Sequence, residues 1–73
     1  MKTRLKERRT AARLTQKQLA EIVSVSPKTI LSIEKEEYSP SLMLAYRLSL
    51  VFGMPMEELF CLKENRQTED EKK

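Results

Sequence analysis

The sequence predicts an all-α domain of five short helices, and three observations support this fold class. The chain has 73 residues, which is enough for one small domain. Its apolar residues recur at helical spacing. Ser, Thr and Pro residues stand directly before several of the apolar runs, where they favour helix starts. A domain of this size buries only about 60% of the surface that its unfolded chain exposes, so dimerisation would add to its stability.

The first helix is predicted over residues 3–12. Strong helix formers fill this segment, and Leu5, Arg9 and Ala12 recur at i, i+4 and i+7. Because few of these residues are apolar, we expect this helix to have a thin core face.

The second helix is predicted over residues 15–23. Thr15 and Gln18 fit a capping box, in which the Thr hydroxyl accepts a hydrogen bond from the backbone N–H of Gln18. The apolar face of this helix is expected to consist of Leu19, Ala20, Ile22 and Val23.

The third helix is predicted over residues 27–35. Ser26 is a suitable N-cap, and Pro27 suits the first helical position because its missing N–H is not needed there. Only residues 24–26 separate the second and third helices, and so short a connection is typical of a helix-turn-helix. The 3.6-residue period places Ile30 and Ile33 on the inner face of the third helix and polar residues on the other.

The fourth helix is predicted over residues 42–52, after a possible cap at Ser41. Gly53 is the only glycine, and it stands where a left-handed residue commonly ends a helix. Pro55 begins a fifth helix that we expect to end near residue 60.

The chain divides at Leu62, after which no apolar residue follows. Residues 1–62 are therefore predicted to form the folded domain. Residues 63–73 are polar and charged, and they are predicted to form a disordered tail because they have no apolar surface to bury.

The composition excludes most catalytic chemistry. The chain has no His, one Cys and only Asp70 as aspartate, whereas acid–base and metal chemistry rely heavily on these residues. We therefore expect no enzyme activity, no cofactor and no metal. Cys61 cannot form an internal disulfide, which fits the reducing cytoplasm. No apolar run approaches the 18 to 20 residues, roughly, that span a bilayer.

The charge is distributed unevenly along the chain. Residues 1–35 carry nine Lys and Arg against three Glu, a net of +6, whereas the remainder carries a net of −3. Such asymmetry is typical of a basic face directed at a polyanion, although lysines scattered over soluble helices would produce part of it.

Five segments, in order, resemble the phage-repressor and Cro-like helix-turn-helix regulators. They are LTQKQLAE (14–21), VSPKTI (25–30), IE (33–34), YSPSL (38–42) and ELF (58–60). The resemblance covers about residues 3–62. It implies a compact five-helix, lambda-repressor-like DNA-binding domain with its helix-turn-helix at helices two and three. The implied function is transcriptional regulation, for example as a repressor, by a homodimer on a palindromic operator of double-stranded DNA.

The sequence departs from this family at three loop positions. Ser24 stands where the family usually has Gly, Lys35 and Glu36 stand where it has Asn-Gly, and Arg13 replaces a frequent Gly. If left-handed backbone is kept at Ser24 and at the Lys35–Glu36 pair, each non-glycine residue costs about 1 kcal/mol. Arg13 adds charge near the start of the second helix.

The outer face of the third helix is the predicted reading surface. Lys28, Thr29 and Ser32 are the expected base contacts, because Lys donates to guanine, Thr contacts a thymine methyl and Ser suits either base edge. The alternative for these three is a merely solvated helix face. The expected phosphate contacts, the first of them implied by the resemblance, are Gln16, Lys17, Ser26, Lys35, Tyr38 and Ser39.

Two further sets of residues are predicted to organise the site. The resemblance implies a structural salt bridge between Arg9 and Glu34, which would orient the third helix without touching DNA. The predicted homodimer interface consists of Met43, Leu50, Met54, Met56, Phe60 and Leu62. The alternative for this second set is core filling of a thin monomer.

Two other classes of function stay open at this point. An antitoxin or accessory protein-binding module would need a segment for its partner, and only the charged tail is available. An RNA-binding module would stack bases on exposed aromatics, whereas the aromatic residues here are expected in loops or in the core.

Overall fold

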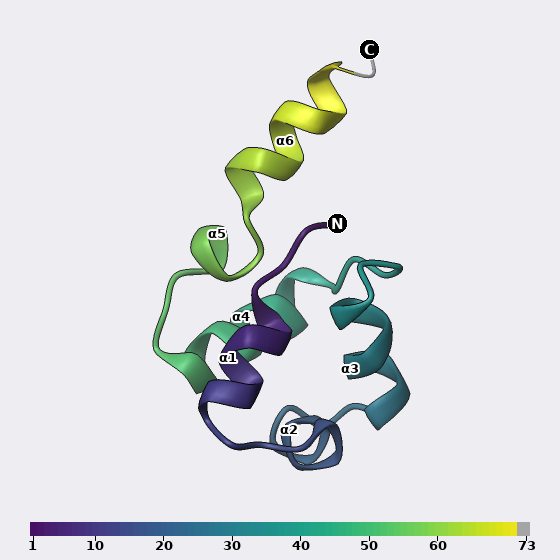
Figure 1. The fold of residues 1–73 in the computed structure, drawn as a ribbon, viewed down its shortest axis with the longest axis vertical. Helices are drawn as coiled ribbons and strands as arrows, with labels where there is room; N and C mark the ends of the chain where they lie inside the picture. Colours follow the sequence, from purple (N-terminus) through teal and green to yellow (C-terminus); the bar gives the residue numbers. More distant parts are fainter. Residues whose placement is uncertain (72–73) are drawn as a thin grey trace.

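The computed structural model describes the backbone of residues 1–71 and the side chains of residues 1–67. The described chain is all-helical, as predicted, with short connections between helices (Figure 1). The helices are α1 (Leu5–Ala11), α2 (Gln16–Ile22), α3 (Pro27–Glu34), α4 (Leu42–Phe52), α5 (Met56–Leu59) and α6 (Leu62–Glu71).

Side-chain caps begin α2, α3 and α4, as the sequence predicts. Thr15 and Gln18 form the reciprocal capping box at α2. At α3, the Ser26 hydroxyl accepts a hydrogen bond from the backbone N–H of Thr29, and at α4, the Ser41 hydroxyl accepts one from the backbone N–H of Leu44. The start of α5 differs slightly from expectation, because Pro55 is the N-cap with extended backbone rather than the first helical residue.

The first four helices end in the same closed turn. A residue with left-handed backbone follows the helix, and its N–H donates to the carbonyl of the residue three positions before it. The N–H of the next residue donates to the carbonyl of the residue five positions before that one. The left-handed residues are Arg13, Ser24, Glu36 and Gly53, with φ between 59° and 63°. Left-handed backbone is therefore adopted at Ser24 and Glu36, the positions considered above, and also at Arg13, and none of the three is glycine.

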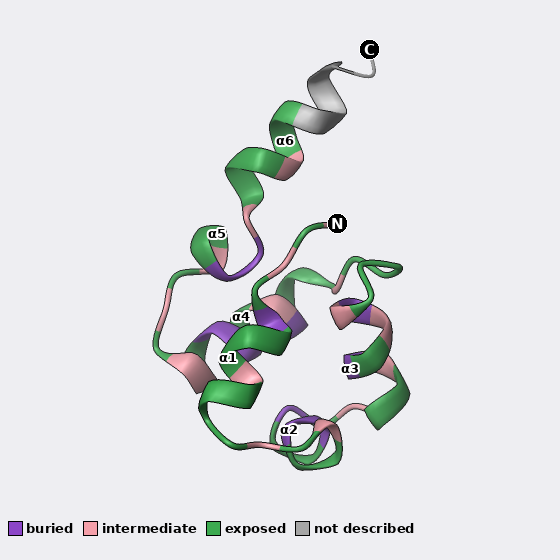
Figure 2. Cartoon of the chain, viewed as in Figure 1, coloured by how far each residue is buried: buried purple, intermediate pink, exposed green. Residues whose placement is uncertain are grey.

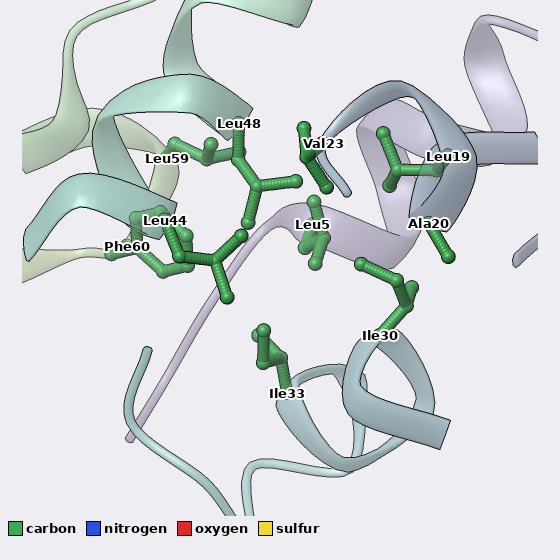
Figure 3. Close-up of a cluster of buried hydrophobic side chains, with 10 residues drawn as sticks. All are labelled: Leu5, Leu19, Ala20, Val23, Ile30, Ile33, Leu44, Leu48, Leu59 and Phe60. Atoms are coloured by element: carbon green, nitrogen blue, oxygen red, sulfur yellow. The ribbon is translucent and has the colours of Figure 1, made fainter. Parts of the chain in front are cut away.

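The core lies where α1 to α5 meet, around the side chain of Leu5 (Figure 3). Leu5 is the core residue of α1, and the other members come from α2 to α5 and from the turns that follow α2 and α5: Leu19, Ala20, Val23, Ile30, Ile33, Leu44, Leu48, Leu59 and Phe60.

Two expected core positions are wrong. Ala12 is exposed because α1 has already ended and Ala12 is its C-cap. Ile22 is also exposed. At 100° per residue it lies about 110° from the centre of the face that Leu19, Ala20 and Val23 bury.

The described residues after Leu62 form a helix, where the sequence predicted disorder. α6 projects away from the body of the domain and is exposed along most of its described length (Figures 1 and 2). Glu, Lys, Arg and Gln are good helix formers, and Asn65 fixes the first turns to the N-terminal segment. The Asn65 amide accepts from the Lys2 backbone N–H at 2.8 Å and donates to the Lys2 and Phe60 carbonyls. Residues 72 and 73 of the predicted tail lie outside the described residues.

Candidate nucleic-acid interface

The predicted base contacts lie together on the outer face of α3. Lys28, Thr29 and Ser32 line one open surface hollow of about 430 Å³, with Ser26 and Tyr38 beside them. α3 runs along one edge of the domain, away from α6 (Figure 1). Its opposite face is buried through Ile30 and Ile33 (Figure 3). α3 is thus anchored on one side and offers small polar groups and one cation on the other.

An ion pair between α1 and α3 fixes the orientation of α3. The Arg9 Nε lies 2.6 Å from Oε2 of Glu34, and Arg9 Nη2 donates to Oε1 at 3.2 Å. Arg9 Nη1 also donates to the Leu14 carbonyl in the turn before α2. The Arg9 and Glu34 side chains are only 12% and 3% exposed. This pair is the one that the family resemblance implies.

Gln16 belongs to the same network. Its Nε2 donates to Oε1 of Glu34 at 3.1 Å, so the first residue of α2 is tied directly to the end of α3. A side-chain amide has two N–H donors, and one of them is engaged here. The predicted phosphate contact by Gln16 therefore depends on the other N–H, held in place by Glu34.

The other predicted phosphate contacts lie at exposed positions, and two of them line the hollow. The exposed residues are Lys17, Ser26, Lys35, Tyr38 and Ser39, of which Ser26 and Tyr38 line the hollow. The Ser26 hydroxyl caps α3 and lies 3.1 Å from the Thr29 hydroxyl. Ser26 thus has a structural role in addition to any contact with DNA.

One residue of the hollow, Glu37, was not anticipated from the sequence. Its backbone N–H bonds to the Ser32 carbonyl at 3.0 Å, as part of the closed turn that ends α3. This turn brings Glu37 to the hollow that the predicted base contacts line. Two adjacent glutamates in a loop give no signal of their own, so only the left-handed turn at Glu36 could have indicated this placement.

The residues predicted for a dimer interface differ in their exposure. Met43 and Leu50 are well exposed on α4, Leu62 is exposed at the start of α6, and Met54 and Met56 are half-buried. Phe60 is only 1% exposed and lies in the core, so its place in the interface is a correction. The turn after α5 directs its ring inward against Leu44 and Leu59 (Figure 3).

Two other exposed apolar residues of α4 were not assigned to this surface. Leu42 and Tyr46 precede Leu50 at intervals of four residues, and all three are exposed. With Met43 they cover an arc of about 100° on the helix. We call these four residues, Leu42, Met43, Tyr46 and Leu50, the α4 apolar face. Its signal in the sequence was the four-residue spacing, which also fits a core face.

The described residues give no indication of a metal site or a membrane span. No group of three or more metal-ligating side chains lies together in this part of the chain. Among the helices of residues 1–71, none is long and apolar enough to cross a bilayer.

Comparisons with known proteins point to one family. The helix-turn-helix family model matches residues 5–59. An uncharacterized HTH-type transcriptional regulator of Archaeoglobus fulgidus is 44% identical over 64 residues, covering 88% of this chain and 90% of that protein. One of Methanocaldococcus jannaschii is 42% identical over 65 residues, covering 89% and 98%. The Bacillus subtilis regulator YgzD, also uncharacterized, is 42% identical over 64 residues, covering 88% and 97%.

Proposed function

We propose that this chain, which belongs to the helix-turn-helix family of DNA-binding transcriptional regulators, recognises a specific double-stranded DNA sequence through α3. The observation that carries the proposal is the pair of opposite faces on α3. One face is buried in the core, and the other presents Lys28, Thr29 and Ser32 around an open hollow. A major groove about 12 Å wide admits one such helix. We expect this binding to take place in the cytoplasm.

The three α3 side chains have the chemistry to discriminate bases. The Lys28 ammonium donates to guanine O6 or N7, the Thr29 methyl packs on a thymine methyl, and the Ser32 hydroxyl donates or accepts at either base edge. The Arg9–Glu34–Gln16 network supports this role, because it holds the helix at a fixed angle to α2. A fixed angle is what lets the same side chains meet the same base edges in each complex.

Residues at the start of α2 and at the two ends of α3 are proposed to bind the DNA backbone. Gln16, Lys17 and Ser26 lie at the starts of α2 and α3, while Lys35, Tyr38 and Ser39 follow α3. Contacts to phosphates on both sides of the groove would set the register of α3 without carrying sequence information.

The α4 apolar face supports a homodimer as the active form. Leu42 is 72% and Leu50 62% exposed, at the two ends of this face, and its four residues lie within one arc of α4. A contiguous apolar surface on a small domain is typical of an interface. Two-fold pairing there, with Met54, Met56 and Leu62 at its margin, would direct both α3 helices toward one palindromic operator, about 34 Å apart.

Selection of bound sites from random duplex DNA tests the reading surface. Lys28→Ala and Ser32→Ala should each weaken binding to the selected site by about 1 to 3 kcal/mol and relax the preference at one position. Lys17→Ala is the matched control, because loss of a phosphate contact should weaken all sequences alike. An unchanged consensus with Lys28→Ala would refute the assignment, and failure of the wild type to bind any duplex would instead favour a protein partner.

Sedimentation of Leu50→Glu tests the dimer. The substitution places a charge within the α4 apolar face, so the protein should shift toward monomer and lose more affinity for a full site than for a half-site. Ile22→Glu is a suitable control, since Ile22 is an exposed apolar residue on another helix. A Leu50→Glu protein that still sediments as the wild type would contradict dimerisation through this face.

A further inference from the structure

The hollow on α3 contains charges of both signs. Lys28 and Glu37 both line it, together with Thr29 and Ser32. The two ion pairs formed among the described residues are Arg9–Glu34 and Lys2–Glu64, so neither Lys28 nor Glu37 is neutralised within this part of the chain. Both charges are therefore available to a molecule that enters the hollow.

Backbone hydrogen bonds fix the position of Glu37. Glu36 adopts left-handed backbone with φ 63°, and the Glu36 and Glu37 N–H groups bond to the carbonyls of Ile33 and Ser32. These hydrogen bonds fix the Cα of Glu37 against the last turn of α3. Its exposed carboxyl group thus extends the reading surface by one side chain beyond Ser32.

A carboxylate at this position has few favourable partners in DNA. It is an acceptor only, and phosphate groups repel it. The groups of the major groove that donate to it are the amino groups of cytosine N4 and adenine N6. A carboxylate beside the groove therefore opposes binding to DNA in general and favours sites that present an amino group at one position.

We propose that Glu37 is a specificity-determining residue, which accepts a hydrogen bond from a cytosine or adenine amino group at the edge of each half-site. The inference rests on the proposed function, in which α3 occupies the major groove. Lys28, in the first turn of α3, reads an acceptor, and Glu37, after the end of α3, reads a donor. The same carboxylate lowers the affinity for unrelated duplexes, because it faces the phosphates when no amino group is in reach.

A comparison of Glu37→Ala with Glu36→Ala tests the proposal. The two substitutions remove the same carboxylate from adjacent exposed residues, but only Glu37 lines the hollow. Alanine is used because a glutamine amide would itself pair with adenine. Sites are selected from random duplex DNA with each protein, and the affinity for an unrelated duplex is measured in parallel. Glu37→Ala should lose the cytosine or adenine preference at one base pair, a change of about 5- to 150-fold in discrimination, and should bind unrelated duplex more tightly. Glu36→Ala should keep the preference.

Three results would overturn the inference in distinguishable ways. If Glu37→Ala selects the wild-type consensus, Glu37 does not read a base, while the proposed function stands. If Glu36→Ala changes the consensus to the same extent, the effect is one of long-range charge. If the wild type binds no duplex at all, the proposed function fails together with this inference.

Discussion

Glu34→Gln should destabilise the domain strongly, although it changes only one atom of the side chain. Oε2 of Glu34 accepts the 2.6 Å hydrogen bond from Arg9 Nε, and Oε1 accepts from Arg9 Nη2 and from Gln16. An amide at this position keeps one acceptor oxygen but directs an NH₂ group at Arg9 or at Gln16. Two donors then face each other, and the Arg9 cation loses its counter-charge.

The size of the effect follows from the burial of the pair. With Arg9 12% and Glu34 3% exposed, water screens the uncompensated guanidinium poorly, and breaking a buried pair costs about 3 to 5 kcal/mol. We take about 3 kcal/mol, since Arg9 keeps its hydrogen bond to the Leu14 carbonyl. Domains near this size have unfolding free energies of about 4 to 11 kcal/mol at 0.05 to 0.15 kcal/mol per residue. The melting temperature should fall by about 12 to 24 °C.

Thermal and urea unfolding followed by circular dichroism measure this loss. Glu64→Gln is the control, because the Lys2–Glu64 pair is 64% and 59% exposed. Such pairs contribute about 0 to 1 kcal/mol. A second variant, Arg9→Met with Glu34→Leu, replaces both charges with apolar groups and should recover part of the loss. The reasoning fails if Glu34→Gln unfolds within about 1 kcal/mol of the wild type, as the control does.

Three further outcomes are expected. Ser24→Gly should raise the free energy of unfolding by about 1 kcal/mol because Ser24 has φ 60°. Gly53→Ala should lower the free energy of unfolding by a similar amount, since its new Cβ meets nothing within 4 Å and only backbone strain is added. Equal melting of Ser24→Gly and the wild type would contradict this expectation. Asn65→Ala should release the start of α6 from Lys2, which hydrogen exchange at the Lys2 amide would detect as lost protection; unchanged protection would refute the anchor. Duplex affinity should fall with salt at about −0.9 per neutralised phosphate in a log–log plot, and Lys17→Ala should remove about one such unit; a flat response in a mobility-shift titration would exclude phosphate contacts.

Local signals explain why most of the fold could be predicted from the sequence. The caps at Thr15, Ser26 and Ser41 are interactions between residues three apart, so the pattern itself contains the contact. The helix-turn-helix follows from the length of one connection. The Arg9–Glu34 pair joins residues far apart in sequence, and it was accessible only because the chain resembles a known family.

The features that the sequence did not predict depend on distant contacts or on the exact end of a helix. α6 is fixed through Asn65 and Lys2, which are 63 positions apart. Phe60 was assigned to the surface because a helix as short as α5 gives too few residues to define a face. Glu37 reaches the hollow through the left-handed turn before it. Tyr46 is exposed with Leu42 and Leu50 at four-residue spacing, but the buried residues Leu44 and Leu48 have the same spacing, so spacing alone does not distinguish the two faces of α4.

The shortness of the helices has a consequence for the lifetime of the protein in a cell. None of the six helices in residues 1–71 exceeds 11 residues, and isolated helices shorter than about 12 to 15 residues are marginal in water. We therefore expect α3 not to persist once the core opens, so that partly unfolded molecules would not present its outer face to DNA. Molecules that bind DNA and molecules that resist proteases would then be the same population. A change of about 1 to 2 kcal/mol anywhere in the core would alter cellular abundance several-fold, and we expect it to alter DNA binding through the same unfolding equilibrium.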